Sequence, residues 1–396
     1  MNTACRVPVA ASCSSTPHPA VLWRPGSSRQ NMQRPDPADR IDHGARIRLG
    51  AAGTKSGFRG RLLGLAGVGA LTALAVLTTL VPGPSQVQAH AADRGPATEL
   101  KLGYFANLTH APALISDSKG LLEGKLEQDG TGLEPQLFNA GPAAIEALNS
   151  GAIDAAYLGP SPALNSYISS KGNSLRIVAG AASGGASLVV KKDIAEPSDL
   201  AGTELATPQF GGTQDVALRH YLAENELLDD ATVTPSSNGT LTQLFGRGAI
   251  DGAGVPEPYA SLLVENYEGH RLVDESSLWP EGKFPTTVLV VAKDFLIEHP
   301  ETVEKLVEAN SEAIDWLNSA EQEEKIVAVQ EALNAANGSS FAQPVISAAL
   351  EEVTFAEDPL ADTYQTLINH AAQVGIGEPG SADGLVDSRF IASQEH

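Results

Sequence analysis

The sequence is poor in cysteine, and its two cysteines, Cys5 and Cys13, both lie within the first 13 residues. The rest of the chain therefore cannot form an internal disulfide, bind zinc through thiolates or use a cysteine nucleophile. Basic residues are scarce as well, with 26 Lys and Arg against 48 Asp and Glu. The formal charge of −22 offers no basic face for nucleic acid, so no nucleic-acid partner is expected.

The sequence also lacks the short motifs that mark common enzyme sites. It contains no GxSxG, HExxH, phosphate-binding loop or CxxC pattern. Serine, histidine and aspartate are present, but no spacing brings them together. No catalytic residue, metal site or cofactor is therefore predicted, and the chain is not expected to be an enzyme.

Charge is distributed unevenly along the chain. Residues 1–91 hold 10 Lys and Arg and 3 Asp and Glu, whereas residues 92–396 hold 16 and 45. Residues 1–54 are rich in Pro, Ser and Arg without periodicity, which is typical of a disordered segment or of a start codon assigned too far upstream. A basic N-terminal segment followed by an acidic remainder is typical of a targeting segment ahead of an exported domain.

The segment 55–91 has the features of a secretory signal. Residues 62–81 carry no charge, basic residues precede them, and an Ala-His-Ala site ends at Ala91. Cleavage after Ala91 or Ala89 is expected, with a retained membrane anchor as the alternative. No cysteine follows the apolar run, so no lipid anchor is expected. The signal itself predicts export, to the periplasm or to the extracellular face of the cytoplasmic membrane.

From residue 98 onward, short apolar runs alternate with helical patterns. The pattern predicts strands over 100–104, 135–138 and 155–158, with helices over 111–119 and 143–150 between them. Such alternation is typical of βαβ units, so an α/β fold with largely parallel sheets is expected.

An internal echo indicates that this unit occurs twice. Residues 147–163 align on residues 244–260 without a gap, and the sequence Gly-Ala-Ile-Asp occurs at 151–154 and again at 248–251. Each copy has the pattern of a helix end, a glycine cap, a buried strand and a turn into the next helix. Two similar α/β lobes are therefore expected.

Two apolar strands, 187–191 and 286–292, indicate hinge crossovers between these lobes. After them, 300–318, 320–336 and 362–374 have helical spacing. With no further strand of their own, these helices are expected to pack on the first lobe. Lobe one would then comprise 98–186 and 292–396, and lobe two 187–291.

The loops that follow the predicted strands are candidates for a ligand site, because ligands of open α/β sheets lie beyond the carboxyl ends of the strands. Six such loops consist mainly of Gly, Ser, Thr, Asn, Gln and Pro, and none contains Arg or Lys. Helix N-termini and neutral donors can hold a compact anion, whereas a phosphate more often recruits Arg. Ordinary turn and capping residues are the alternative for each loop.

The sequence does not decide between alternative roles for four residues in these loops. Thr213 could cap a helix or point at a ligand, and His110 could be a neutral donor to an anion or a packed histidine without a role. Asp215, in the first turn of a helix, is expected to be a dipole partner or a surface group. Glu257 could accept an ammonium group, bridge the lobes or be exposed, with exposure preferred.

Taken as a set, several motifs resemble one protein family. They are YFANLTHAP (104–112), NAGP (139–142), GAID (151–154), TPQFGGTQD (207–215), PEPY (256–259) and FPTTV (284–288). They resemble substrate-binding proteins of ABC transporters for sulfonate, nitrate, taurine and bicarbonate, closest to the aliphatic-sulfonate members. The resemblance covers about residues 98–375.

This resemblance implies a two-lobe periplasmic-binding-protein fold of type II, with two parallel or mixed sheets joined by two hinge crossovers. It implies a monomer that binds a small oxyanion, most simply an aliphatic sulfonate, and delivers it to an ABC permease and its ATPase. By position, it places the ligand contacts at Asn107, His110, Gly141, Ser161, Ser183, Gly185, Gln209, Gly212, Thr213, Gln214 and Glu257.

Other functions on this scaffold stay open at this point. Taurine, nitrate or bicarbonate could take the same site, and Glu257 keeps an amino-sulfonate in consideration. An enzyme resembling a thiamine-pyrimidine synthase is the alternative of another class, although the cysteine-rich pattern of that enzyme is missing from residues 92–396.

Overall fold

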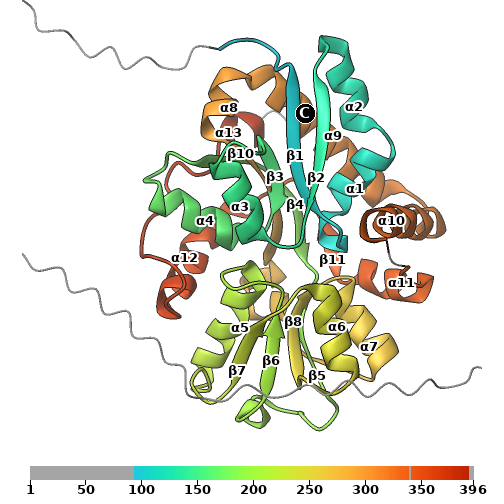
Figure 1. Ribbon diagram of the computed structural model, residues 1–396, viewed down its shortest axis with the longest axis vertical. Helices are drawn as coiled ribbons and strands as arrows, with labels where there is room; N and C mark the ends of the chain where they lie inside the picture. The colour runs from blue at the N-terminus through green and yellow to red at the C-terminus, as the bar shows by residue number, and fades with distance from the viewer. Residues whose placement is uncertain (1–92, 339, 392–396) are drawn as a thin grey trace, which may run out of the picture. The chain divides into compact units, whose positions relative to one another are not determined.

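Two β-sheets form the framework of the chain in a computed structural model, which describes residues 93–338 and 340–391 (Figure 1). The larger sheet has the strand order β11-β4-β10-β3-β1-β2 and the smaller one β7-β6-β8-β5-β9. The larger sheet contains β1 (Glu99–Phe105), β2 (Gly132–Phe138), β3 (Ala155–Leu158), β4 (Leu175–Gly184), β10 (Pro285–Ala292) and β11 (Val353–Phe355). The smaller sheet contains β5 (Ala186–Val190), β6 (Glu204–Thr207), β7 (Thr232–Pro235), β8 (Gly252–Pro256) and β9 (His270–Asp274).

Both sheets are mixed, and their parallel parts are the predicted βαβ units. β1 is parallel to β2 and β3, and β6 is parallel to β7 and β8. The remaining strands, β4, β10 and β11 in one sheet and β5 and β9 in the other, pair antiparallel. The expected α/β fold class is thereby confirmed. More strands pair antiparallel, however, than the alternation of strands and helices along the sequence predicts.

The repeated Gly-Ala-Ile-Asp motif has the same structural role in each sheet. Asp154 Oδ2 accepts a hydrogen bond from the Lys101 backbone N–H (2.9 Å), and Asp251 Oδ2 accepts one from the Glu204 N–H (2.9 Å). Each aspartate thereby ties the start of its own strand to the parallel neighbour, β1 or β6. Gly151 and Gly248 have φ values of +74° and +70°, the left-handed conformation that ends the preceding helix.

Helices cover both faces of the larger sheet, which explains its continuous apolar strands. In β10, Leu289 and Val291 join the core beneath α1 (Ala111–Ser118), whereas Val288 and Val290 join the core beneath α4 (Pro160–Ser169). The first of these faces also carries α2 (Leu121–Leu126) and α9 (Pro300–Ser319), and the second carries α3 (Gly141–Asn149) and α12 (Tyr364–Gln373). Proline in the first turn of α1, α3, α4 and α9 suits the start of a helix, where its missing N–H costs nothing.

The smaller sheet repeats this arrangement with three helices. Its strands pack on one face against α5 (Thr213–Glu224) through Leu188, Leu205 and Leu222. On the other face, α6 (Asn238–Gly246) and α7 (Tyr259–Tyr267) contribute Phe245 and Leu263. Because these helices pack firmly on the sheet, the loops that precede them are held in fixed positions.

The chain passes from the larger sheet to the smaller between β4 and β5, and it has returned by β10. The first crossing is at Gly184 and Gly185, both with positive φ. β4 continues to Gly184, so Ser183, one of the predicted ligand contacts, lies in a strand. The return comes earlier than the expected boundary at 291, because β10 lies between β3 and β4 of the larger sheet.

The last third of the described chain contains helices, the loops between them and one strand, β11. α8 (Lys293–Glu298), α10 (Gln322–Asn337), α11 (Gln343–Glu351) and α13 (Ser388–Ile391) accompany α9 and α12. The expectation of no further strand was wrong, because β11 adds an edge to β4. α9 and α12 pack on the larger sheet, and in addition α11 contacts α7 and α12 contacts α5 of the smaller sheet.

The predicted disordered segment 1–54 and the predicted signal 55–91, with its apolar run 62–81, lie outside the described residues. Within the described part of the chain, every helix is too short or too polar to cross a bilayer.

Candidate functional site

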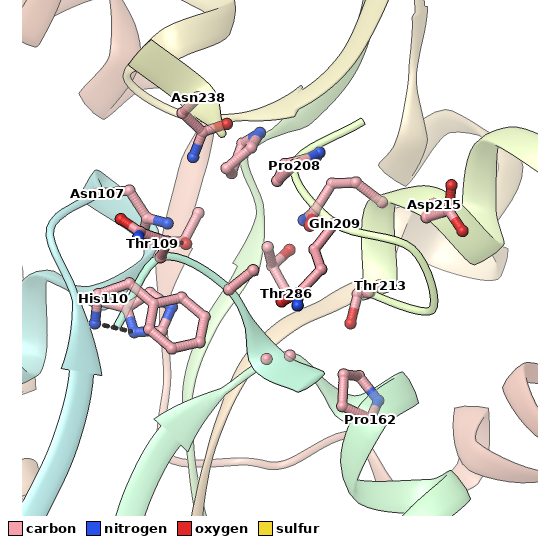
Figure 2. A pocket seen from close by; sticks show the side chains of 18 residues that line it. Asn107, Thr109, His110, Pro162, Pro208, Gln209, Thr213, Asp215, Asn238 and Thr286 are labelled. Carbon is pink, nitrogen blue, oxygen red and sulfur yellow. Dashed lines mark hydrogen bonds between the residues drawn. The ribbon is translucent and has the colours of Figure 1, made fainter. Parts of the chain in front are cut away.

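A cleft lies where loops from the two sheets meet, and we call it the anion cleft (Figure 2). It encloses about 430 Å³ of space, part of which is open to solvent. Of the residues predicted as ligand contacts, seven line it: Asn107, His110, Gly141, Gln209, Gly212, Thr213 and Gln214. No lysine or arginine belongs to its lining in the described chain, so its donors are neutral amides, hydroxyls, one imidazole and backbone N–H groups.

His110 is a buried, uncharged donor at one wall of the cleft. It is 2% exposed, and burial lowers its pKa to about 3. Its Nδ1 accepts a hydrogen bond from the Phe105 backbone N–H at 3.4 Å, which places the proton of the neutral ring on Nε2. The ring packs against Phe105 with centroids 4.2 Å apart. The ring is both neutral and packed, so donation from Nε2 to a ligand stays a prediction.

Helix N-termini from both sheets converge on the cleft. The lining includes Gly141 at the start of α3, Thr213 at the start of α5 and Asn238 at the start of α6. The N-caps of α3 and α5 are Ala140 and Gly212, which have no capping side chain. Backbone N–H groups in these first turns thus remain available as donors, and the helix dipoles favour an anion.

Thr213 joins the start of α5 to the start of α4. Gly212 is the N-cap, so Thr213 is the first helical residue, and its Oγ1 accepts a hydrogen bond from the Ser161 backbone N–H at 3.3 Å. Gly159 allows this approach, because a Cβ there would lie 2.2 Å from Thr213 Oγ1. Ser161 is 1% exposed, and its hydroxyl has no hydrogen-bond partner among the described residues.

Asp215 lines the cleft but has its own partners. It is fully buried, so of the two expected roles, dipole partner or surface group, the surface group is wrong. Its carboxylate accepts hydrogen bonds from Thr207 Oγ1 (2.8 Å), the Gly211 backbone N–H (3.0 Å) and Arg219 Nε (3.1 and 3.2 Å). Figure 2 shows this carboxylate turned away from the centre of the cleft. The negative charge is therefore neutralised on the far side from a ligand.

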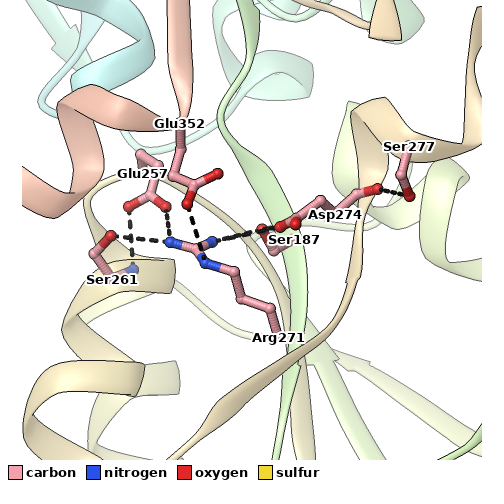
Figure 3. Close-up of polar contacts among 7 residues, drawn as sticks. All are labelled: Ser187, Glu257, Ser261, Arg271, Asp274, Ser277 and Glu352. Carbon is pink, nitrogen blue, oxygen red and sulfur yellow. Dashed lines mark hydrogen bonds and ion pairs between the residues drawn. The ribbon is translucent and has the colours of Figure 1, made fainter.

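Glu257 lies in a buried ionic cluster beside the cleft, and its preferred exposure was wrong (Figure 3). Glu257 Oε1 accepts a hydrogen bond from Arg271 Nη2 at 2.6 Å, and Oε2 accepts one from the Ser261 backbone N–H at 3.1 Å. Burial raises the pKa of the Glu257 carboxyl, and Arg271 and Ser261 oppose that rise. Arg271 also lies 3.7 Å from a carboxylate oxygen of Glu352, which immediately precedes β11 of the larger sheet. Glu257 thus links α7 to β9 of the smaller sheet, and Arg271 extends this link to Glu352 beside β11 of the larger sheet.

The other predicted contacts lie near the cleft without lining it. Ser183 is in β4, paired with Thr354 of β11. Gly185 forms the crossing to β5, where a Cβ would lie 2.4 Å from Val353 Cγ2 and 3.3 Å from Thr109 Cγ2. The Gly185 carbonyl accepts a hydrogen bond from the Glu257 backbone N–H at 2.9 Å. These residues lie where the chain crosses from the larger sheet to the smaller one.

Four polar lining residues were missed as contacts: Thr109, Asn139, Asn238 and Thr286. Asn139 opens a loop after a predicted strand, so its position alone was a usable signal. Asn238 begins α6 after β7, a short polar strand that sequence patterning did not predict. Thr286 lies in β10, and the apolar run around it predicts a buried strand and gives no sign that one of its residues lines a cleft.

The described residues contain no cluster of His, Cys, Asp or Glu that could hold a metal ion.

Comparison with known proteins identifies the family. The sequence model of the NMT1-like family matches residues 93–331, which is more than half of the chain. The chain belongs to the NMT1-like family. This match and the solved neighbours confirm the resemblance drawn from the sequence motifs.

Curated relatives of this NMT1-like protein are 25–28% identical to it over the aligned residues. A protein of Brucella abortus, named as a binding protein without a stated ligand, is 25% identical over 221 residues, 55% of this chain. The match spans 66% of that relative's length. The taurine-binding periplasmic protein of Escherichia coli is 28% identical over 190 residues, 47% of this chain and 58% of the relative.

Solved structures of binding proteins share the fold. The alkanesulfonate-binding protein of Xanthomonas axonopodis, bound to MOPS, has a TM-score of 0.60 at 18% identity, covering 72% of this chain and 95% of its own. The periplasmic nitrate-binding protein of Synechocystis has a TM-score of 0.61 at 18% identity, covering 75% and 88%. At this identity the likeness establishes the architecture and leaves the ligand open.

Proposed function

We propose that this protein is the extracytoplasmic solute-binding component of an ABC importer and that it binds a small oxyanion, an aliphatic sulfonate in the first instance, in the anion cleft. The single observation that carries this proposal is the lining of that cleft. Three helix N-termini and the neutral His110 ring meet there without lysine or arginine. Fixed dipoles of this kind stabilise a singly charged, compact anion.

In this account the two sheets are the centres of two lobes that close on the ligand. A ligand that contacts both lobes favours the closed state by its differential affinity. The contact between Thr213 and Ser161 belongs to that closed state, and the Gly184–Gly185 crossing and the return before β10 act as the hinges. The partners are a membrane permease and its ATPase, and the protein acts as an exported monomer that binds without turnover.

A thermal-shift screen tests this function. Methanesulfonate, ethanesulfonate, taurine, nitrate and bicarbonate are each added in excess to the purified protein. A ligand at about a hundredfold excess over its Kd adds roughly 2.7 kcal/mol of stability, a clear rise in Tm. At least one sulfonate is expected to raise Tm and to be recovered unchanged. No shift with any of these anions, or formation of a product, would contradict the proposal.

A further inference from the structure

A second cavity, which we call the side cavity, lies directly beside the anion cleft. The two cavities share four lining residues, Phe105, Asn107, Asn139 and Asn238. In Figure 2, Asn107 and Asn238 lie toward one end of the anion cleft, away from Pro162. The side cavity encloses about 1440 Å³, open to solvent, against about 430 Å³ in the anion cleft. A ligand whose anionic head occupies the cleft can therefore extend past these asparagines into the side cavity.

The lining of the side cavity is uncharged but rich in hydrogen-bonding groups. In the described structure it contains no Asp, Glu, Lys, Arg or His, although the whole chain carries a formal charge of −22. A side-chain amide both donates and accepts hydrogen bonds, as a hydroxyl group does. Six lining residues carry such an amide: Asn107, Asn139, Asn238, Gln243, Asn266 and Asn337. The lining thus matches a neutral group that donates and accepts hydrogen bonds at several points.

Several of these amides have hydrogen-bonding capacity that the protein does not use. Asn107 is 4% exposed, and its Oδ1 accepts a hydrogen bond from Thr109 Oγ1 at 2.9 Å, which leaves its Nδ2 without a partner in the described chain. Asn238 Oδ1 is buried and accepts no hydrogen bond from any described residue. Gln243 and Asn266 are exposed on α6 and α7, and no described residue bonds to their amides. An alkyl group that covered these amides would displace their water without replacing its hydrogen bonds, which costs affinity.

The side cavity also contains aromatic rings in fixed positions. Tyr267 is 39% exposed, and a Cβ at Gly246 of α6 would lie 2.5 Å from its ring, so the ring rests on the helix backbone. Phe341 meets the Tyr259 ring edge-on, with centroids 5.6 Å apart. Aromatic rings pack against C–H groups, whereas amides bind hydroxyl groups. A sugar or polyol presents both kinds of surface, so its chemistry matches both parts of this lining.

Other kinds of tail match the lining less well. A charged tail would find no counter-charge in the described part of the side cavity, and burying an unpaired charge is costly. Asp215, the one carboxylate that lines the anion cleft, is already bonded to Arg219. A bare inorganic anion would leave the side cavity to water.

From these contacts we infer that the ligand is a polyhydroxylated oxyanion, a sulfonated sugar or polyol. Its anionic head lies in the anion cleft and its hydroxyl groups lie among the amides of the side cavity. This inference rests on the proposed function, because it needs the head in the anion cleft. It goes beyond an aliphatic sulfonate, because the hydroxyl groups are what the side cavity recognises.

Isothermal titration of the purified protein tests this inference with two pairs of sulfonates that differ in their hydroxyl groups. The first pair is 2,3-dihydroxypropane-1-sulfonate and propane-1-sulfonate, which have the same carbon chain. The second pair is 6-deoxy-6-sulfoglucose and hexane-1-sulfonate, which have six carbon atoms each. The hydroxylated member of each pair is expected to bind at least about fivefold more tightly, since each hydrogen bond to an unpartnered amide adds about that factor.

Substitutions in the side cavity locate the hydroxyl groups. Gln243→Ala and Asn266→Ala each remove one unpartnered amide, and each is expected to reduce the ratio of sulfoglucose to propane-1-sulfonate affinity about threefold or more. Gln322→Ala is the matched control, because Gln322 is an exposed glutamine at the first residue of α10 and lines neither cavity. It is expected to keep the wild-type ratio.

Two results would overturn the inference. One is a hydroxylated sulfonate that binds no more tightly than its alkyl counterpart, and the other is an unchanged ratio in both Gln243→Ala and Asn266→Ala. Each of these leaves the proposed function standing, because an anion still binds. Absence of binding by all four sulfonates would instead refute the proposed function, and the inference with it.

Discussion

Thr213 Oγ1, at the first residue of α5, accepts a hydrogen bond from the backbone N–H of Ser161 in the first turn of α4 at 3.3 Å. Pro160 and Pro162 flank Ser161, so its N–H is the only backbone donor of these three residues. The contact joins the two sides of the anion cleft directly. Under the proposed function it belongs to the closed state, in which Thr213 takes part in closure.

Thr213→Ala is expected to weaken sulfonate binding about fivefold, because it removes one hydrogen bond of the closed state worth ~1 kcal/mol. Thr213→Ser keeps the hydroxyl and is expected to retain most of the affinity. Isothermal titration of the two variants beside the wild type measures the difference. Equal affinity in all three proteins would show that the contact does not contribute to closure.

The buried pair of Glu257 and Arg271 is expected to be a stability element. Arg271→Met should lower the free energy of unfolding by ~3–5 kcal/mol, because it leaves the Glu257 carboxylate buried without its charge partner. The double variant Glu257→Gln/Arg271→Met should recover much of that loss, since no unpaired charge remains. Urea unfolding of the single and double variants measures both values. If the double variant were as unstable as the sum of its singles, the two side chains would not be coupled.

Acid should destabilise the protein through His370 in particular. Its ring stacks on His220 of α5 with centroids 3.4 Å apart, and burial, followed by the charge of His220, lowers the pKa of His370 to about 4. The unfolded chain takes up a proton near its ordinary pKa of about 6.5, so stability is full above that pH and is lost as pH falls toward 4.

His370→Phe keeps an aromatic ring on His220 and removes one of the two titrating groups. Its loss of stability between about pH 7 and 4.5 is expected to be smaller than that of the wild type. Urea midpoints at the two pH values measure this for both proteins. Parallel losses in the two proteins would show that His370 does not contribute.

Anion binding, in contrast, should be nearly independent of pH. His110 is neutral throughout the range in which the protein is used, because burial lowers its pKa to about 3. Sulfonates also keep their charge, so titrations between about pH 6 and 8 should give one affinity. Affinity that tightens about tenfold as the pH falls through 6.5 would show a protonated His110 in the site.

Sequence patterning located the strands that are buried on both faces. β3 begins and ends where the apolar run at 155–158 predicts, and Asp154 and Asp251 make equivalent hydrogen bonds in the two copies of the repeat. The short edge strands β7, β9 and β11 were missed, since strands of three to five residues with polar positions leave no periodicity to detect.

The site prediction was incomplete for a similar reason, because some side chains come together only in the fold and leave no local pattern in the sequence. Glu257 is neutralised by Arg271 from β9, fourteen residues further along, and only the pairing of β5 with β9 brings them together. Asp215 and Arg219 are separated by one helical turn, a spacing that sequence alone could have detected. The larger cavity beside the anion cleft, which shares Asn107 and Asn238 with it, joins residues of β2, α6, α7 and α10, which no local sequence pattern connects.

The most direct test of the account is a calorimetric titration of propane-1-sulfonate into the wild type and Gly159→Ala. A Cβ at Gly159 would lie 2.2 Å from Thr213 Oγ1 and so force the two sides of the anion cleft apart. Gly124→Ala is the matched control, because a Cβ there meets nothing within 4 Å. We expect one saturable site per chain in the wild type and in the control, and affinity reduced more than about tenfold in Gly159→Ala. No binding to the wild type, or equal binding by Gly159→Ala, would contradict an anion site in this cleft.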